Sequence, residues 1–317
     1  MAQFFHAALL RFARHDPVAS RRRHRHDKPD MSTYDNSFIL TVDCPDTIGI
    51  VAAVAGCLSE QGLFVEESAH FGDRDTGHFF MRTVFTPQGG HYSRGAFSER
   101  FAPIAQKFDM AWQVHDIKVR PRVLIMASRH EHCVNDLLYR YRTGALPMDI
   151  PAIISNHMDL AGLAEWHRVP YYHIPVTPES KAEAEARLLE IVADTNTDLV
   201  VLARYMQVLS AATCERLAGR VINIHHSFLP GFKGARPYQK AHARGVKLIG
   251  ATAHYVTPDL DEGPIIEQGV ERVDHRHSPE ELAAVGRDVE SLTLARAVKL
   301  HIEQRVFING GKTVILR

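Results

Sequence analysis

Asn223 and His225 are the side chains whose types and spacing point most directly to chemistry. They stand two residues apart at the end of an apolar, β-branched run, residues 221–224, which predicts a short buried strand. Because residues two apart on an extended backbone share a face, the amide and the imidazole are expected to point the same way. Such a pair at a strand end can stabilise an oxyanion as it develops.

A carboxylate is available further along the chain in Asp261-Glu262-Gly263-Pro264. An acid that arrives from a later loop can fix the tautomer of the imidazole or accept a proton from water. His254 precedes Asp261 in a segment that is typical of a strand. Considered singly, an Asn at a strand end more often satisfies backbone groups, and a lone His is more often a core residue. The residues alone leave both interpretations open.

A metal site is the other chemistry that this stretch could support. His225, His226, His254 and Asp261 together offer enough ligand atoms for zinc. However, His225 and His226 are adjacent on the expected strand, so their rings are expected on opposite faces. The stretch also lacks the His-x-x-x-His spacing of a helical site. We therefore expect no metal.

These residues require a sheet that brings distant segments together. Short apolar, β-rich runs alternate with helical segments, of which the clearest is 179–194, introduced by Thr177-Pro178 as cap and first-turn proline. Such alternation favours a mostly parallel sheet covered on both faces, with ligands bound beyond the carboxyl ends of the strands. The predicted strands before 221–224 are 123–127, 152–155, 171–175 and 199–202.

A smaller domain is predicted upstream, with the order βαββαβ of a ferredoxin-like fold. Its strands and helices are separated by turn-rich segments such as 73–77, and residues 119–122 are typical of a linker. We expect this domain to span 37–118 and the parallel-sheet domain to span 119–317. The predicted elements are strands 38–42, 63–69, 79–85 and 112–117, a helix from Ile50 closed by Gly62, and a helix carrying Phe97 and Phe101.

Bulk composition limits the partners of the chain. Its 317 residues suffice for two cores, and Lys plus Arg equals Asp plus Glu at 37 each. No net field therefore favours nucleic acid or a membrane surface, and no apolar run approaches the roughly 18 residues of a membrane span. The four cysteines lack Cys-x-x-Cys spacing, which favours reduced thiols and a cytoplasmic protein.

Residues 1–30 differ from the rest because they are rich in arginine and poor in acids. Such a start can be a transit peptide or a nucleic-acid-binding arm. It can also be a disordered tail, or an extension upstream of a native start at Met31. We favour a disordered tail over 1–36, since nothing later in the chain supports the other interpretations.

The motif as a whole carries a family resemblance. Asn-x-His followed by Ser-x-Leu-Pro, with Leu-Asp-x-Gly-Pro beyond it, resembles the folate-dependent formyltransferase family. The stretches 202–210 and 231–235 resemble it too, and the likeness covers roughly 37–317. It implies a Rossmann-like domain in which Asn223, His225 and Asp261 are the catalytic residues, with His254 in a supporting position. Asn223 and His225 would then stabilise the oxyanion, and Asp261 would orient the water and the imidazole.

The same resemblance implies that 10-formyltetrahydrofolate is a substrate and that no cofactor is needed. The segment 206–209 matches the part of the family that binds the pterin through its backbone, and 256–261 matches the opposite wall. The alternative for Met206 and Val208 is packing in the core. Both roles are compatible, because a flat ring needs apolar walls. The implied folate-binding residues are Met206, Gln207, Val208, Leu209, Val256, Thr257 and Asp259.

The acceptor decides between hydrolysis and transfer. In the purine-pathway members of the family, a Gly-rich loop after the first strand of the catalytic domain cradles the phosphate of the acceptor. The corresponding stretch here, 128–135, contains no glycine, although Arg129 could bind an anion. Whole segments match best the members that hydrolyse their substrate to tetrahydrofolate and formate. We expect hydrolysis, which would supply formate to one-carbon and purine metabolism; the alternative is formyl transfer to an amine.

The upstream domain resembles an ACT domain through Asp-x-Pro-Asp-x-x-Gly-Ile, which includes Asp46, Gly49 and Ile50. The resemblance implies an amino-acid effector, such as glycine or methionine, and a homo-oligomer formed through paired ACT domains. A purely structural alternative has Gly49 begin a helix and Asp46 cap it. A further alternative is an amino-acid sensor whose second domain binds folate without catalysis.

Overall fold

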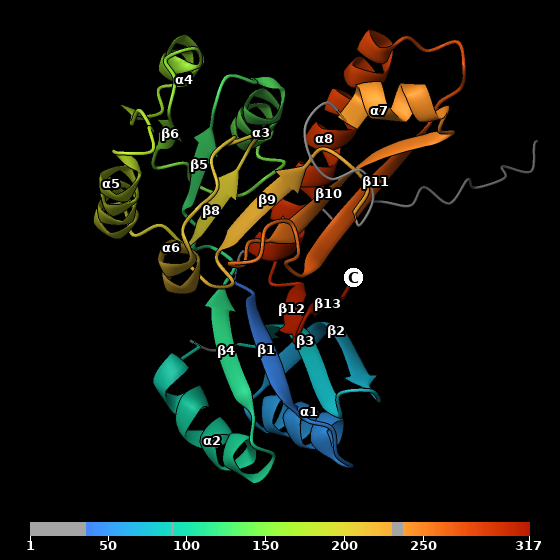
Figure 1. The fold of residues 1–317 in the computed structure, drawn as a ribbon. Helices are drawn as coiled ribbons and strands as arrows, with labels where there is room; N and C mark the ends of the chain where they lie inside the picture. The colour runs from blue at the N-terminus through green and yellow to red at the C-terminus, as the bar shows by residue number, and fades with distance from the viewer. Residues whose placement is uncertain (1–35, 90–91, 230–236) are drawn as a thin grey trace, which may run out of the picture. The chain divides into compact units, whose positions relative to one another are not determined.

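The computed structural model describes residues 36–89, 92–229 and 237–317. The predicted tail lies outside these ranges up to residue 35, as do Pro230 and the matched stretch 231–235. The described residues form two sheets, with a short hairpin at the C-terminal end (Figure 1). None of the described helices is long and apolar enough to cross a membrane.

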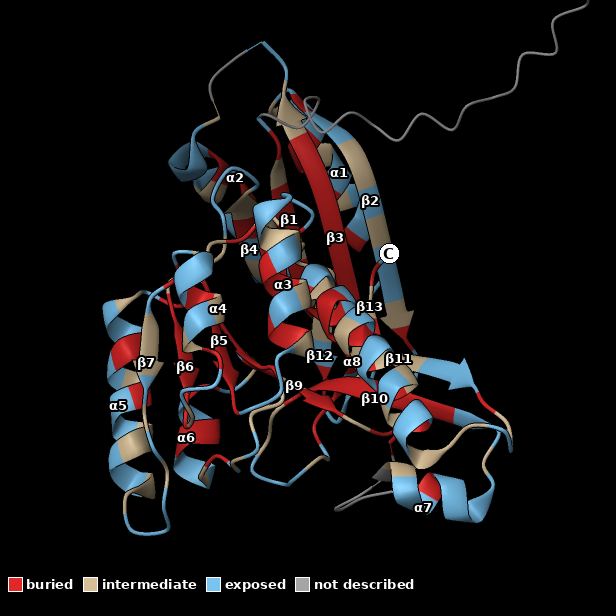
Figure 2. Cartoon of the chain, turned by 90° about the horizontal axis from the view of Figure 1, so that it is seen from above, coloured by how far each residue is buried: buried red, intermediate tan, exposed pale blue. Residues whose placement is uncertain are grey.

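The first sheet has four antiparallel strands in the order β2-β3-β1-β4, so the predicted ferredoxin-like βαββαβ order is confirmed. Its middle strand β3 is buried along nearly its whole length (Figure 2). Gly62, at a φ of 66°, follows the first helix as predicted. The elements are β1 (Phe38–Pro45), α1 (Ile50–Glu60), β2 (Leu63–Asp73), β3 (His78–Pro87), α2 (Arg94–Lys107) and β4 (Ala111–Asp116).

Aromatic side chains fill the core between this sheet and its helices. The rings of Phe97 and Phe101 stack with centroids 5.3 Å apart, and the Trp112 ring meets Phe101 edge-on at 4.8 Å. Rings in these arrangements bury much apolar area and gain additional attraction from their quadrupoles. The predicted α2 therefore forms despite Pro103 within it.

The second sheet has seven strands in the order β11-β10-β9-β8-β5-β6-β7. The five strands from β9 to β7 are parallel and the pairs β9–β10 and β10–β11 are antiparallel, which confirms a mostly parallel sheet. Its strands are β5 (Val123–Ala127), β6 (Ile153–Ser155), β7 (Tyr171–His173), β8 (Leu199–Leu202), β9 (Val221–His225), β10 (Leu248–Tyr255) and β11 (Ile265–Arg272).

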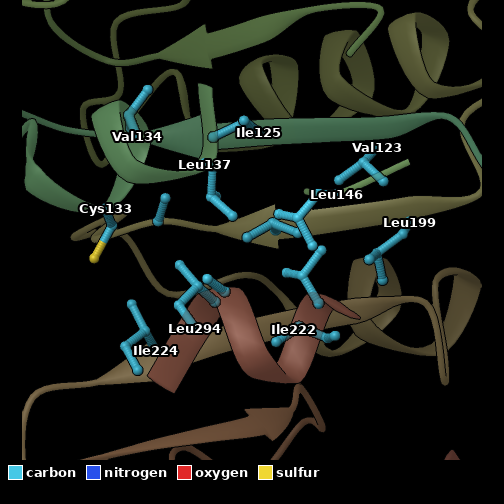
Figure 3. Packing of buried hydrophobic residues seen from close by; sticks show 14 of the residues in the cluster. Val123, Ile125, Cys133, Val134, Leu137, Leu146, Leu199, Ile222, Ile224 and Leu294 are labelled. Carbon is cyan, nitrogen blue, oxygen red and sulfur yellow. The ribbon is translucent and has the colours of Figure 1, made fainter. Parts of the chain in front are cut away.

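Helices cover both faces of this sheet, because alternate residues of each parallel strand enter different cores. In β5, Ile125 packs with α3 and α8, whereas Met126 packs with α5 and α6. Figure 3 shows Ile125, Leu137 of α3 and Leu294 of α8 in the first of these cores. The helices are α3 (His132–Arg142), α4 (Ala161–Trp166), α5 (Lys181–Asp194), α6 (Ala211–Arg216), α7 (Pro237–Arg244) and α8 (Pro279–Ile302).

The predicted start of α5 is wrong. The helix begins at Lys181, its N-cap is Ser180, and no side chain caps it. Thr177 and Ser180 instead hydrogen-bond each other's backbone N–H groups in a turn before the helix. This local pairing satisfies the groups that the expected cap would have served.

The C-terminal hairpin contacts the four-stranded sheet. It consists of β12 (Val306–Asn309) and β13 (Lys312–Ile315). The Asn309 side chain donates to Asp73 Oδ2 at 2.6 Å, and Lys312 Nζ lies 2.9 Å from the same oxygen. The two sheets have separate cores, which fits a division into 37–118 and 119–317, but this division stays a prediction.

Candidate active site

The site is built on the register between β9 and β10. Asn223 and His225 lie on one face of β9, while Ile222 and Ile224 enter the core on the other face. The antiparallel pairing places His254 of β10 directly opposite Asn223. Directly opposed residues of a pair have side chains within contact distance. The sheet itself therefore brings the predicted amide and the second histidine together.

Hydrogen bonds fix the orientation of both side chains. His254 Nδ1 lies 2.8 Å from the Tyr255 carbonyl oxygen, which can only accept, so this nitrogen carries the proton. Burial lowers the pKa of His254, so the ring is neutral and its Nε2 is an acceptor. Asn223 Nδ2 lies 3.2 Å from that Nε2 and donates to it. For the second N–H of this amide, no hydrogen bond is found among the described residues.

Asp261 meets the other histidine. His225 Nδ1 lies 3.2 Å from Asp261 Oδ1, and the same oxygen is 3.8 Å from His254 Nε2. The hydrogen bond from His225 outweighs the effect of burial and lowers the pKa of Asp261, so the carboxylate is ionised. His225 Nε2 is buried and has no hydrogen-bond partner among the described residues. A buried polar atom left in this state favours a role in binding or reaction.

The approach of Asp261 depends on the loop that follows β10. Asp261 has a φ of 58°, a left-handed conformation that is uncommon for a residue with a side chain. Two residues later, a Cβ added to Gly263 would fall 1.7 Å from the Tyr255 carbonyl oxygen. The Tyr255 N–H also donates to the Pro264 carbonyl at 2.9 Å. Glycine is therefore required for the acid loop to close against β10.

The expected orientation of His226 is wrong. The rings of His225 and His226 stack with centroids 4.9 Å apart and an interplanar angle of 24°. The strand ends at His225, so the alternation of faces does not extend to His226. The argument against a metal site that rested on opposite faces therefore does not hold.

A different group of potential metal ligands occurs in the described part of the chain, namely His132, Cys133 and Glu290, whose ligand atoms lie within 4.8 Å of one another. Its chemistry does not favour a cation. Arg204 Nε lies 3.5 Å from Glu290 Oε2 and already supplies positive charge. Burial raises the pKa of the Cys133 thiol far above its usual value, whereas metals bind the thiolate.

The folate-binding candidates border one core cluster. Leu209 belongs to the core on the α5–α6 face, and Val256 packs against it. Met206 and Val208 are 55% and 52% exposed, so the alternative that they pack in the core is wrong. Gln207 is half-buried, Thr257 Oγ1 donates to the Asp259 carbonyl, and Asp259 is exposed. The two segments therefore lie on the face of the sheet that carries Asn223 and His225.

Sequence reasoning missed several polar side chains that support this region. Ser128 Oγ donates to Asn156 Oδ1 at 2.7 Å and accepts from the Met206 N–H at 2.9 Å, so it anchors the start of the 206–209 segment. Thr252 Oγ1 donates to the Ser227 carbonyl and accepts from the Leu229 N–H, both at 3.0 Å. These contacts join residues far apart in sequence, and no local spacing signals them.

The ACT-like motif lies between β1 and α1. Gly49 is the N-cap of α1 at a φ of 99°, so the helix begins there as the structural alternative expected, but no side chain caps it, so the cap by Asp46 in that alternative is wrong. The Asp46 N–H donates to the Gly77 carbonyl at 2.7 Å. Ile50 is 2% exposed and lies in the core, whereas Ile48 is 98% exposed. Of the predicted regulatory positions, Ile50 therefore does not present its side chain to a ligand.

Comparisons with known proteins show the family of the chain. A family model described as formyl transferase matches residues 121–298. A formyltetrahydrofolate deformylase of Corynebacterium sp. (strain P-1) is 48% identical over 279 residues, which cover 88% of this chain and 98% of that protein. A crystal structure of a formyltetrahydrofolate deformylase from Burkholderia mallei superposes with a TM-score of 0.86 at 56% identity, over 89% of this chain and all of that chain. The chain belongs to the formyltetrahydrofolate deformylase family.

The Burkholderia mallei deformylase structure covers 89% of this chain, whereas a transformylase structure covers a smaller share. A glycinamide ribonucleotide transformylase from Symbiobacterium toebii superposes with a TM-score of 0.59 at 30% identity, over 62% of this chain and 95% of that one. The predicted enzyme family and α/β fold class are thus confirmed. The roles of individual residues stay predictions.

Proposed function

We propose that this protein hydrolyses 10-formyltetrahydrofolate to tetrahydrofolate and formate. The observation that carries the proposal is the buried Nε2 of His225, which has no hydrogen-bond partner among the described residues. The His225 ring shares a face of β9 with the Asn223 amide, and its Nδ1 lies 3.2 Å from Asp261 Oδ1. The relatives at 38–48% identity bear the name formyltetrahydrofolate deformylase, which supports the substrate.

The two polar groups on β9 would stabilise the negative charge that develops on the formyl oxygen. Asn223 donates one N–H to His254 and keeps the other for the oxyanion. His225 donates from Nδ1 to Asp261, and its doubly protonated imidazolium form would also donate from Nε2 to the same oxyanion. Donors fixed before the reaction cost no reorganisation when the charge appears. Stabilisation of the oxyanion therefore depends on the orientation of the Asn223 amide, which the hydrogen bond to His254 fixes.

Asp261 would orient both the imidazole and the attacking water. Its Oδ1 accepts from His225, and as an ionised carboxylate it can accept a hydrogen bond from water and pass a proton towards the leaving nitrogen. Water adds to the formyl carbon, the tetrahedral intermediate collapses, and the carbon–nitrogen bond breaks as the nitrogen is protonated. The products are formate and tetrahydrofolate, and no covalent intermediate is required.

Exposed apolar side chains would form the walls for the flat ring system of the folate. Met206 and Val208 come from the loop after β8, and Leu260 from the loop after β10. Exposed apolar groups from two separate loops, with backbone donors between them, suit an amphipathic heteroaromatic ring. Gln207, Leu209, Val256, Thr257 and Asp259 lie in the same two segments and complete the proposed folate site.

The stretch 128–135, where an acceptor would bind, fits hydrolysis better than formyl transfer. In the glycine-free stretch 128–135, the Ser128 hydroxyl is engaged with Asn156 and Met206, and His132 begins α3. A phosphate nest needs backbone N–H groups turned towards one point, which glycines allow. The experiment is to incubate the purified protein with 10-formyltetrahydrofolate and no amine, and to measure formate. Formate release supports hydrolysis, whereas turnover that requires an added amine indicates the transferase.

We further propose that the N-terminal sheet binds an amino acid, such as glycine or methionine, near Asp46 and Gly49. The support is the exposed Ile48 between these residues, beside the left-handed Gly49. Calorimetry on the full chain tests the proposal. Saturable heat with either amino acid, lost in Gly49→Val, would support it, and no heat with either would count against it.

The same sheet would join two copies of the chain. Among the described strands β2 pairs only with β3, and its Phe64, Val65 and Phe71 are exposed. An edge strand with exposed apolar residues favours pairing with another chain. Light scattering should give at least a dimer, and Phe71→Lys should shift it towards monomer. A monomeric parent protein would contradict the proposal.

A further inference from the structure

Glu290 is a buried carboxylate that the proposed chemistry does not use. Its side chain is 1% exposed, and it meets side chains from three other parts of the fold. His132 Nε2 lies 2.8 Å from Oε2, Tyr238 donates its hydroxyl to Oε1 at 2.7 Å, and Arg204 Nε lies 3.5 Å from Oε2. A carboxylate this deeply buried is stable as an anion only when it is paired.

The charge state of Glu290 follows from these partners. Burial by itself would raise the pKa of Glu290, but the hydrogen bond from His132 and the charge of Arg204 outweigh it, and the pKa is lower than usual. Glu290 is therefore an anion that faces the guanidinium of Arg204. The Arg204 Nε is buried and has no hydrogen-bond partner among the described residues. Within those residues, the ion pair with Glu290 is therefore the contact that stabilises the buried guanidinium.

Arg204 occupies an unusual place in the backbone. Its φ is 65°, a left-handed conformation that a residue with a Cβ adopts only when its surroundings hold it there. The Arg204 carbonyl accepts from the Ser128 N–H at 3.3 Å, and the Met206 N–H donates to Ser128 Oγ. This turn therefore sets where the segment 206–209 leaves β8.

Helix α8 leaves room for Tyr238 beside Glu290. A Cβ added to Gly286, one turn before Glu290, would fall 2.0 Å from the Tyr238 hydroxyl oxygen. Tyr238 can reach Glu290 only because this position carries no side chain. The hydroxyl thereby holds the second carboxylate oxygen, which leaves Oε2 directed at His132 and Arg204.

We propose that Glu290 is a positioning residue for folate binding, whose charge holds Arg204 in the left-handed turn that presents Met206–Leu209 to the substrate. The proposal rests on the proposed function, since it takes 206–209 as a wall of the folate site. Glu290 acts through Arg204 and does not touch the reacting atoms. Its effect should therefore appear in substrate binding and not in the chemical step.

Glu290→Gln tests the charge while the volume is kept. The amide oxygen can still accept from Tyr238, and the amide N–H can donate to a neutral His132, but nothing anionic faces Arg204. If the turn then adopts its left-handed form in only about a tenth of the molecules, KM rises about tenfold while kcat stays within about twofold. Tyr238→Phe is the matched comparison, because it removes one hydrogen bond to Glu290 and keeps the charge that faces Arg204. Its KM should rise less than that of Glu290→Gln.

A rescue distinguishes positioning from general stability. Glycine adopts the left-handed conformation without a partner, so Arg204→Gly in the Glu290→Gln background should return KM to within about threefold of the parent. Arg204→Gly alone should bind folate nearly as well as the parent. Failure of the rescue would overturn the proposal. So would a KM for Arg204→Gly alone as high as that of Glu290→Gln, because Arg204 would then contact the substrate directly.

Binding of tetrahydrofolate, measured by calorimetry on the same five proteins, separates this proposal from the proposed hydrolysis. The dissociation constants should follow the order expected for KM. If the parent protein releases no formate but the five dissociation constants follow the expected order, hydrolysis is wrong and the positioning role stands. If formate is released and the five dissociation constants are equal, the positioning role is wrong.

Discussion

Two carboxylates, the half-buried Asp261 and the buried Glu290, stand where the parallel strands of the large sheet end, and each holds a histidine, yet their surroundings differ. Asp261 accepts from His225, whose Nε2 has no partner among the described residues. Glu290 has both oxygens engaged, by His132, Arg204 and Tyr238. A network that ends in an unpaired buried atom is prepared for a substrate, whereas a closed network supports the backbone around it. The comparison predicts that changes in the first cluster affect rate, and changes in the second affect stability and binding.

The largest effect is expected for Glu290→Ala. Removing one partner of a buried ion pair leaves the other charge uncompensated, which typically costs about 3–5 kcal/mol of folding free energy. Urea unfolding of the variant and the parent measures this difference. A loss below about 1 kcal/mol would show that the closed network does not support the fold.

Asn223→Ala should lower kcat by about 10² to 10³, because one donor to the oxyanion is lost. Formate release under substrate saturation measures it. The matched control is Asn135→Ala, which removes an exposed amide on α3 and should leave kcat unchanged. Unchanged turnover in Asn223→Ala would remove the basis for catalysis and would favour a folate-binding sensor.

His254→Leu should lower kcat about tenfold, which corresponds to the loss of one buried hydrogen bond of roughly 1–1.5 kcal/mol. The Asn223 amide then rotates freely between productive and unproductive orientations. KM should hardly change, since His254 is not expected to touch the folate. If KM rises and kcat does not fall, His254 belongs to the binding surface and not to the oxyanion support.

The smallest effect is expected in the dependence of folding stability on pH. Burial lowers the pKa of His254, and it lowers the pKa of His301 to about 4. The unfolded chain, with histidines near pH 6.5, therefore binds more protons than the folded protein as the pH falls below that value. Stability should decrease on acidification, by about 1 kcal/mol for His301 between pH 7.5 and 5.5. Urea unfolding at both pH values tests the sign, and His301→Gln should reduce the slope.

The sequence predicted the scaffold well wherever burial follows the strand period. The expected ranges 123–127 and 199–202 coincide with β5 and β8. Their residues alternate between two apolar cores, so each strand is an unbroken apolar run whose ends are visible in the sequence. The period of two also placed Asn223 and His225 on one face of β9. The family motif, not the pattern, indicated which later acid would join them.

The rest of the site depends on events that the local pattern does not encode. The ring of His226 stacks on His225 because the strand ends there, and a one-residue difference in a strand end reverses the expected face. The Glu290 cluster joins four separate elements, so each of its members resembles an ordinary surface or helix residue in the sequence. Register and helix packing, which are long-range, decide both outcomes.

The carbonyl oxygen of Tyr255 links two parts of the site that would otherwise vary independently. It holds the proton on one nitrogen of His254, and the same oxygen leaves no room for a side chain at Gly263. Tautomer and loop closure thus share a single backbone atom. If a longer loop were grafted between β10 and Gly263, the protein should lose both the fixed tautomer of His254 and the position of the Asp261 carboxylate.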